Sequence, residues 1–186
     1  YYDIILREVL RLSRLIDDLM ELSRLQSGAI AVEVHPLDIH ELLLDICERY
    51  ANIAREKNRN FTWADAIEDC PRVVTNPDRI EQLMVILLDN AIKYTSSGGT
   101  VTVEVKNYEL FSAIRVTDTG PGFTPEALAK AGEMLYTDAA RSDASHQGLG
   151  LYFAKKVAQF HGGTLVLSNL SGTHGACAEL RLPIGR

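Results

Sequence analysis

The chain has 186 residues, a formal net charge of −6 and 46% hydrophobic residues, which indicates a soluble globular protein rather than a disordered one. It has no block of Lys or Arg, so we do not expect a nucleic-acid-binding surface, which needs a concentrated basic patch. The three cysteines are far apart and lack metal-ligand spacing. We therefore expect buried thiols in a reducing compartment rather than disulfides or a zinc site. No apolar run approaches the roughly 18 residues of a membrane span.

The first predicted element is a helix over about residues 1–26, a stretch without glycine or proline. Its apolar residues follow a heptad repeat, widened on one flank: Ile5, Leu12 and Leu19 with Leu15, Leu22, Val9 and Ile16. This pattern is typical of a helix in a bundle, and a lone helix cannot bury such a stripe. We therefore expect partner helices from elsewhere in the protein or from a second copy.

A strand is predicted over residues 29–35, where β-branched residues alternate with other residues. A helix is expected over about residues 39–57, because its apolar residues recur at helical spacing. Two short strands follow, over residues 61–63 and 72–75. His35 and His40 flank the start of the helix without partner ligands at metal spacing, so we interpret them as capping or surface residues.

The central stretch, residues 79–95, is predicted to lie in a helix that has Asn76 as its N-cap and Pro77 at its first position. Its apolar residues would all lie on one buried face: Ile80, Leu83, Met84, Leu87, Leu88, Ala91 and Ile92. Three polar or aromatic residues remain at the C-terminal end, and they share one stripe: Asn90, Lys93 and Tyr94.

Each of these three residue types has a use at a nucleotide site. The amide oxygen of Asn90 is a hard, neutral ligand suited to Mg²⁺. The ammonium of Lys93 would act as a point charge toward phosphate, and the ring of Tyr94 would cover a base or ribose. Taken alone, the same three residues fit a solvated helix end equally well.

An antiparallel pair of strands is predicted over residues 100–106 and 110–118. The second strand runs directly into Asp118, followed by Gly120 and Gly122. A carboxylate at this strand end would accept a hydrogen bond from an adenine amino group, and the glycines would allow a flat ligand to approach the backbone. The alternative for this motif alone is a tight turn closed by an Asx hydrogen bond.

Residues 123–147 are rich in small and polar residues and have weak helical patterning, so we expect a lid or binding loop. Gly148, Leu149 and Gly150 then open a helix over residues 152–160, where backbone N–H groups favour phosphate. For the glycines alone, a packing role is the alternative. Two strands, over residues 164–169 and 176–182, complete the predicted elements.

The order and spacing of these motifs resemble the sensor histidine kinases of two-component systems. LLDNAIKYT resembles the N box of that family, DTGPG its first glycine box, GLGL its second, and the region of Gly172 and Thr173 its third. The resemblance implies an α+β fold, a Bergerat-type α/β sandwich in which helices cover one face of a mixed sheet, preceded by one long bundle helix. It places residues 1–28 in the second helix of a dimerisation and histidine-phosphotransfer domain and residues 29–186 in a catalytic ATP-binding domain.

The resemblance also implies a role for each motif residue around ATP and Mg²⁺. Asn90 would hold the metal, Lys93 and Arg141 would face phosphate, Tyr94 would flank the nucleoside and Asp118 would read adenine. The remaining implied binding residues would shape the pocket: Gly120, Gly122, Gly148, Leu149, Gly150 and Thr173.

The sequence departs from the family pattern at three places. Ile86 stands where the family often has Asn, so part of the metal and phosphate shell must be filled otherwise. In the lid, an aromatic pair is replaced by Met134 and Leu135, and His146 stands where glycine is common. No phosphoacceptor histidine motif occurs in the chain, and we assign that role neither to His161 nor to His174.

The leading hypothesis is a kinase that transfers the γ-phosphoryl of ATP to a histidine outside this chain, for relay to an aspartate of a response regulator. The resemblance implies a homodimer formed through bundle helices. It also implies a cytoplasmic domain that contacts neither membrane nor nucleic acid, in a full-length protein anchored in a membrane. Two alternatives stay open. One is a non-catalytic nucleotide-binding or dimerisation module; the other is a hydrolytic ATPase, which needs a carboxylate where this chain has Ile86.

Overall fold

The computed structural model describes residues 34–63, 72–130, 133, 149–172 and 174–184, together with Ile5, Val9, Met20 and Ser23. Within these ranges the helices are α2 (Ile39–Glu56), α3 (Pro77–Tyr94), α4 (Pro125–Lys130) and α5 (Gly150–Phe160). The strands are β1 (His35–Asp38), β2 (Asn60–Trp63), β3 (Arg72–Thr75), β4 (Thr100–Asn107), β5 (Phe111–Asp118), β6 (Thr164–Asn169) and β7 (Ala176–Pro183). The predicted bundle helix lies almost wholly outside the described residues; its four described positions are helical and exposed.

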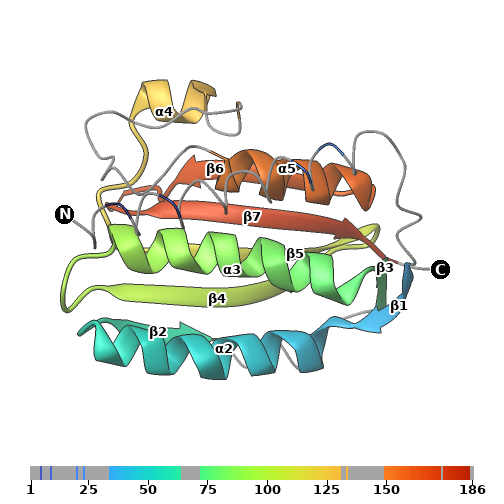
Figure 1. Cartoon of the computed structure of the whole chain (residues 1–186), viewed down its shortest axis with the longest axis horizontal. Helices are drawn as coiled ribbons and strands as arrows, with labels where there is room; N and C mark the ends of the chain where they lie inside the picture. Colours follow the sequence, from blue (N-terminus) through green and yellow to red (C-terminus); the bar gives the residue numbers. More distant parts are fainter. Residues whose placement is uncertain are drawn as a thin grey trace.

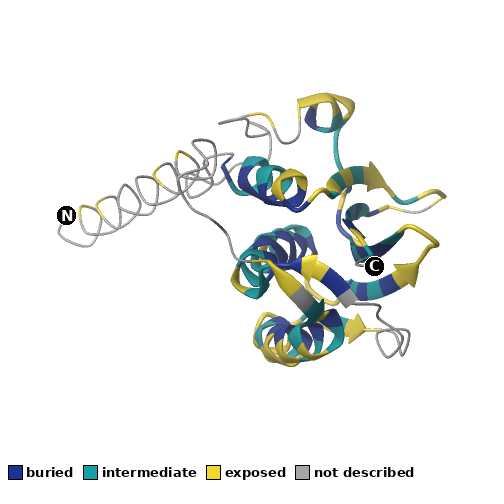
Figure 2. Cartoon of the chain, turned by 90° about the vertical axis from the view of Figure 1, so that its right-hand side faces the viewer, coloured by how far each residue is buried: buried dark blue, intermediate teal, exposed yellow. Residues whose placement is uncertain are grey.

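The main sheet has five strands in the order β2-β4-β5-β7-β6. Strand β2 runs parallel to β4, and the other neighbouring pairs are antiparallel. Helices α2, α3 and α5 cover one face of this sheet, while α4 lies apart from them (Figures 1 and 2). The arrangement confirms the predicted α+β sandwich with a mixed sheet and helices on one face.

The two faces of the sheet differ in chemistry because side chains alternate along each strand. Val101, Val103 and Val105 of β4 are buried under the helices. On the opposite face Arg115 lies between two carboxylates, with its Nε 3.2 Å from Glu179 and its Nη1 3.7 Å from Glu104. The apolar face therefore holds the sandwich together, and the other face is a ladder of alternating charges.

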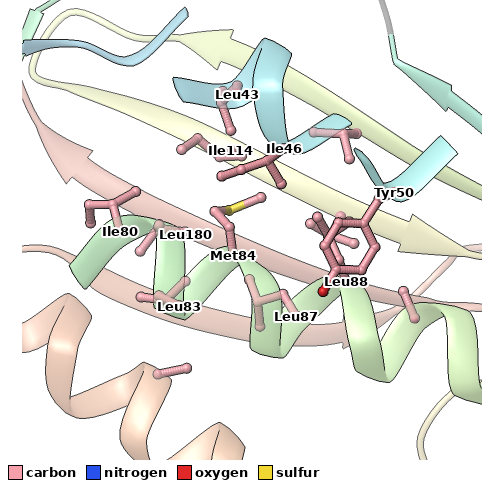
Figure 3. Packing of buried hydrophobic residues seen from close by; sticks show 14 of the residues in the cluster. Leu43, Ile46, Tyr50, Ile80, Leu83, Met84, Leu87, Leu88, Ile114 and Leu180 are labelled. Atoms are coloured by element: carbon pink, nitrogen blue, oxygen red, sulfur yellow. The ribbon is translucent and has the colours of Figure 1, made fainter. Parts of the chain in front are cut away.

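The hydrophobic core is arranged around α3, whose apolar face was predicted residue by residue. Figure 3 shows Met84 between α2 and the sheet, with Leu83, Leu87 and Leu88 on the same helix. Burying each such side chain contributes about 2 kcal/mol. At the rim, the hydroxyl of Tyr50 donates to the carboxylate of Asp89 at 2.8 Å, so the helix pair is joined by a polar contact as well.

The start of α3 is capped as the sequence predicts. The side-chain oxygen of Asn76 accepts the N–H of Arg79 at 3.2 Å, and Pro77 is the first helical residue. His161, at the end of α5, is buried and bonds to this cap, since its Nε2 accepts the N–H of Asn76 at 3.3 Å. Its Nδ1 lies 2.8 Å from the carbonyl oxygen of Val157. His161 therefore joins two helices, and burial lowers its pKa.

The structure corrects the predicted first strand. Residues 29–33 lie outside the described residues, and the observed strand β1 continues through Pro36 to Asp38, beyond the predicted end of the strand at residue 35. Proline is tolerated there because, among the described strands, β1 pairs with β3 alone, and a strand with one neighbour can include a residue that lacks an N–H. Helix α5 begins at Gly150, two residues before the predicted start.

The remaining predicted strands and helices occur close to their expected bounds. The carboxylate of Asp38 caps α2 by accepting the backbone N–H of His40 at 3.0 Å. The cap is therefore the aspartate, and the role expected for the His40 side chain stays a prediction. Among the described helices, none combines the length and apolar character that crossing a membrane requires.

Candidate functional site

The C-terminal end of α3 carries the predicted polar stripe. Its last turn contains Asn90, Lys93 and Tyr94, and the Lys93 ammonium lies 5.1 Å from the centre of the Tyr94 ring. A cation over an aromatic face is attractive and limits the conformations of both side chains. The Asn90 amide is half-buried, and within the described part of the chain no group forms a hydrogen bond with it. Among those described residues, the amide N–H₂ and the amide oxygen of Asn90 therefore both remain available for a ligand.

Asp118 ends β5 and faces the helices. It is directly opposite Val101 in the ladder, and residues directly opposite share one face of a sheet. The side chain is nearly buried, at 7% exposure. One carboxylate oxygen, Oδ1, accepts the N–H of Gly120 at 2.8 Å and, more weakly, that of Ala176 at 3.4 Å. The Asx turn considered from the sequence thus forms, yet it uses only this oxygen. No donor among the described residues reaches Oδ2.

The environment of Asp118 raises the pKa of its carboxyl group. Burial is the larger effect and disfavours the charged form, while the backbone N–H groups of Gly120 and Ala176 oppose it. Among the described residues, no ion pair offsets the charge. A buried carboxylate with a spare acceptor suits a ligand that donates one hydrogen bond and carries no charge at that atom.

The strand tip and the helix end are in direct contact. A Cβ added to Gly120 would lie 2.6 Å from the carbonyl oxygen of Tyr94 and 2.8 Å from Oδ1 of Asp118. Only glycine allows this approach, which explains the residue type at this point of the motif. The structure therefore brings Asp118 beside the stripe that holds Asn90 and Lys93.

The start of α5 packs against the same helix one turn earlier. A Cβ on Gly150 would lie 3.2 Å from a methyl group of Ile86, which precedes Asn90 by four residues on α3. Leu149, just before α5, is buried, and it accepts the first hydrogen bond of the helix from Phe153 at 2.8 Å. The start of α5 and the strand tip thus both lie against the C-terminal half of α3.

The structure adds residues to this region that the sequence did not single out. Gly175 approaches the carbonyl of Asp118 so closely that a Cβ would overlap the carbonyl oxygen. Asn169 clamps Phe123: its Oδ1 accepts the Phe123 N–H at 2.6 Å and its Nδ2 donates to the Phe123 carbonyl at 2.9 Å. Gly122, which the sequence did single out, lies beside this clamp with a φ of 72°, a left-handed conformation that favours glycine. Only the glycines gave a sequence signal, as turn residues.

Several predicted site residues lie outside the described residues: Arg141, Gly148 and Thr173, with Met134, Leu135 and His146 of the lid. Their roles stay predictions. Among the residues described, no group of His, Cys, Asp and Glu is arranged to hold a metal ion. Cys47 and Cys177 are buried free thiols, as expected, and burial raises the pKa of Cys47 to about 12. Cys70 is outside the described ranges.

Comparison with known proteins shows the family to which the chain belongs. Residues 75–186 match the family of histidine kinase-, DNA gyrase B-, and HSP90-like ATPases. The chain is 32% identical over 176 residues to the adaptive-response sensory kinase SasA of Rippkaea orientalis, covering 94% of the chain and 44% of that protein. It is 31% identical to the signal transduction histidine-protein kinase BaeS of Escherichia coli, covering 96% of the chain and 38% of BaeS. The chain therefore spans less than half the length of these relatives.

Solved structures agree with the fold. Full-length ShkA in complex with AMPPNP superposes with a TM-score of 0.79 at 27% identity, covering 98% of this chain and 38% of ShkA. The histidine kinase ThkA, in complex with the response regulator TrrA, superposes with a TM-score of 0.76 at 22% identity, covering 98% of this chain and 50% of ThkA. The chain therefore belongs to the family of histidine kinase-, DNA gyrase B- and HSP90-like ATPases, and the curated relatives it resembles are sensor kinases.

Proposed function

We propose that this chain binds ATP with Mg²⁺ and supplies the kinase domain of a sensor histidine kinase. The observation that carries the proposal is the nearly buried Asp118 carboxylate, which lies beside the helix end that bears Asn90 and Lys93. Its Oδ2 accepts a hydrogen bond from no donor in the described part of the chain. The exocyclic amino group of adenine is an uncharged donor of the kind this oxygen would accept. The bound state of one structural neighbour, which holds an ATP analogue, agrees with this assignment.

The residues at the end of α3 fit the polyphosphate side of the ligand. Asn90 would hold Mg²⁺ through its amide oxygen, since its half-buried amide has no described protein partner and Mg²⁺ needs few protein ligands. Lys93 and Arg141 would face phosphate, and Tyr94 would flank the nucleoside. Gly120, Gly122, Gly148, Leu149, Gly150 and Thr173 would line the pocket. A bound magnesium ion would neutralise charge on the phosphate oxygens.

The reaction would move the γ-phosphoryl group from ATP to an imidazole nitrogen of a histidine outside this chain. The unprotonated imidazole nitrogen forms a bond to the γ-phosphorus, the bond from that phosphorus to the bridging oxygen breaks, and ADP leaves. The ring then loses the proton on its other nitrogen to solvent. Such transfers depend mainly on positioning and charge neutralisation, so the residues of this site have no covalent step to perform. Their task is to hold the nucleotide in line with the acceptor.

We propose a response-regulator receiver domain as the partner that accepts the phosphoryl group. The complex of ThkA with the response regulator TrrA supports this choice. Residues 1–28, as the second bundle helix, would pair with a second copy of the protein, because the heptad stripe needs partner helices. In the full-length protein this domain would be cytoplasmic and joined to a membrane anchor.

Ile86 separates the kinase proposal from the hydrolytic alternative. It lies against Gly150, in the turn of α3 before Asn90, and its side chain cannot activate water. A hydrolytic ATPase needs a general base within reach of that water. Because Ile86 also replaces an Asn that is common in the family, a third function remains to be tested: a module that binds nucleotide without transferring phosphate.

The phosphoryl-transfer experiment distinguishes these functions. The chain would be extended at its N-terminus by a bundle helix of the family that carries its histidine, then incubated with γ-labelled ATP and Mg²⁺. We expect label on the protein that is lost in acid and stable in base, as a phosphoramidate is, and no label when that histidine is Gln. Nucleotide binding without label would establish the module; release of free phosphate without label would establish the hydrolase.

Replacement of Asn90 tests the metal assignment. For Asn90→Ala we expect ATP affinity to stop depending on Mg²⁺, with a loss on the order of tenfold at millimolar Mg²⁺. The measurement is isothermal titration calorimetry with and without EDTA. Asn52→Ala, an exposed asparagine on α2, is the control and should keep the metal dependence. An unchanged Mg²⁺ dependence in Asn90→Ala would remove Asn90 from the site.

A further inference from the structure

The loop that joins α2 to β2 contacts the turn directly after the candidate site. The Nε–H of Arg59 donates to the carbonyl oxygen of Thr95 at 2.6 Å, and its Nη1 donates to the carbonyl of Lys57 at 2.8 Å. Thr95 follows Tyr94, the last residue of α3. The half-buried Arg59 side chain therefore fixes the residue adjacent to the stripe of Asn90, Lys93 and Tyr94.

The backbone of the same loop binds the rest of the turn. Asn58 has a φ of 54°, a left-handed conformation that asparagine tolerates. In this conformation its carbonyl accepts the N–H of Gly98 at 2.7 Å. Asn60 donates its N–H to the carbonyl of Gly99 at 2.8 Å and its side-chain Nδ2 to the carbonyl of Gly98 at 3.1 Å. The turn is thus held along its length.

The other side of this turn contacts the Asp118 strand tip. The N–H of Thr100 donates to Oγ1 of Thr119 at 2.9 Å, and the N–H of Thr119 donates to the carbonyl of Thr100 at 3.1 Å. Gly120 packs against the carbonyl of Tyr94, as described above. In Figure 1 the end of α3, the start of β4 and the α2–β2 connection lie at the same end of the sandwich. A shift of the turn would therefore change the spacing between Asn90 and Asp118.

Charge explains why an arginine is suited to this position. The carbonyl end of a helix carries a partial negative charge, which is unfavourable beside a polyphosphate. The guanidinium of Arg59 is bonded to the first carbonyl after α3 and offsets this charge. Its planar group also reaches the Lys57 carbonyl at the same time, which one ammonium cannot do with the same geometry.

We propose that Arg59 is a positioning residue for the nucleotide site: by joining the α2–β2 loop to the carbonyl of Thr95, it sets the distance between the Asn90 stripe and Asp118. This inference rests on the proposed function, and it assigns a role to a residue outside the motifs that identify the family. Arg59 touches neither the nucleotide nor the metal in this account, so its effect is on affinity through geometry.

The test measures the Kd for ATP with Mg²⁺ by calorimetry on the whole chain, at a temperature where circular dichroism shows each variant folded. For Arg59→Gln we expect affinity weaker by about tenfold, because charged hydrogen bonds of this kind are lost. Arg59→Lys should recover part of the loss through a single donor. Arg55→Gln is the control and should bind like the wild type. Arg55 is an exposed arginine four residues earlier, and its side chain hydrogen-bonds only to Asn52 among the described residues.

A second readout separates positioning from stability. In Arg59→Gln the backbone amides of Gly98 and Gly120 should shift in heteronuclear NMR spectra, and the Gly98 amide should exchange faster with solvent. If Arg59 only stabilised the fold, the melting temperature would fall while the folded variant kept the wild-type Kd. That result would overturn the inference and leave the proposed function intact.

If Arg59→Gln does not fold, the Kd of Arg59→Lys becomes the test. Wild-type affinity in Arg59→Lys would also contradict the positioning role of Arg59. A wild-type chain that does not bind ATP would instead overturn the proposed function, and this inference with it.

Discussion

Burial of the Asp118 carboxylate destabilises the folded state, and a role in ligand binding explains why a carboxylate is present at this position. Its carboxyl is nearly buried, its charge has no described cationic partner, and burial raises its pKa. A folded-state pKa above the unfolded value of about 3.9 means that the folded chain holds this proton to higher pH. The folded state therefore gains the full stabilisation from protonated Asp118 below about pH 3.9. This stabilisation is lost as pH rises through the folded-state pKa, so at neutral pH the ionised group opposes folding.

The variant Asp118→Asn should separate stability from binding. At pH 7 we expect a melting temperature equal to or above that of the wild type, because the variant keeps an oxygen for the Gly120 N–H and buries no charge. The excess stability of the variant should shrink as pH falls toward 4. Affinity for ATP should fall by about tenfold to a hundredfold, since an amide N–H₂ would then face the adenine amino group. Thermal unfolding at several pH values and calorimetry provide the two measurements.

Asp89→Asn is the matched control for Asp118→Asn. Asp89 is an exposed carboxylate on α3 that accepts a hydrogen bond from Tyr50. Its replacement should alter stability without changing ATP affinity. If both variants bound ATP as the wild type does, the carboxylate at the strand tip would have no part in adenine recognition.

At the residue scale, local contacts were predictable from sequence and distant ones were not. The Asn76 cap and the Asx turn of Asp118 join residues two or three positions apart, so the residue types and their spacing are sufficient signals. The bond from Arg59 to Thr95 joins residues 36 positions apart. A single sequence contains no pattern that indicates which distant backbone carbonyl an arginine side chain will contact. The Asn169 clamp on Phe123 was unpredictable for the same reason.

At the element scale, the apolar periodicity of α3 and the alternation in β4 and β5 fixed their type and face, because burial on one side decides both. The error at β1 has a different origin. A four-residue strand that contains Pro36 has no alternation to read, and it exists only because β3 provides a partner distant in sequence. Short strands on edges depend on tertiary contacts that no local pattern encodes.

The end of β6 anchors the segment that leads from the Asp118 tip to α4. Asn169 binds both backbone groups of Phe123, as a neighbouring strand would. For Asn169→Ala we expect faster amide exchange at Phe123 and faster proteolysis between residues 123 and 130, with a loss of about 1 to 2 kcal/mol of local stability. Hydrogen exchange read by mass spectrometry would measure the first effect, and limited proteolysis followed by mass spectrometry the second.

The control for Asn169→Ala lies at the opposite end of the sheet. The side chain of Asn107 accepts a hydrogen bond from Ser112 within the β4–β5 hairpin. Asn107→Ala should loosen that hairpin and leave exchange at Phe123 unchanged. Equal protection of Phe123 in Asn169→Ala and the wild type would show that other contacts hold this segment.

At the scale of the whole molecule, the described core begins with α2. The cluster of buried residues runs from Ile39 to Leu182 and draws on α2, α3, α5 and the main sheet. Of the residues described before β1, Ile5, Val9 and Met20 are more than half exposed. Their exposure agrees with the prediction that residues 1–28 form a helix whose partners come from outside this sandwich.

Removal of residues 1–33 tests this division of the chain. We expect residues 34–186 to fold alone, with a melting temperature within about 4 °C of the whole chain, since a loss of no more than about 1 kcal/mol is anticipated. The Kd for ATP should stay within about twofold, because the described site residues all lie after residue 85. If the heptad stripe pairs two copies, sedimentation should show self-association of the whole chain and a monomer after truncation. A truncated chain that fails to fold, or that loses ATP binding while folded, would make the helix part of the catalytic domain and contradict the predicted boundary.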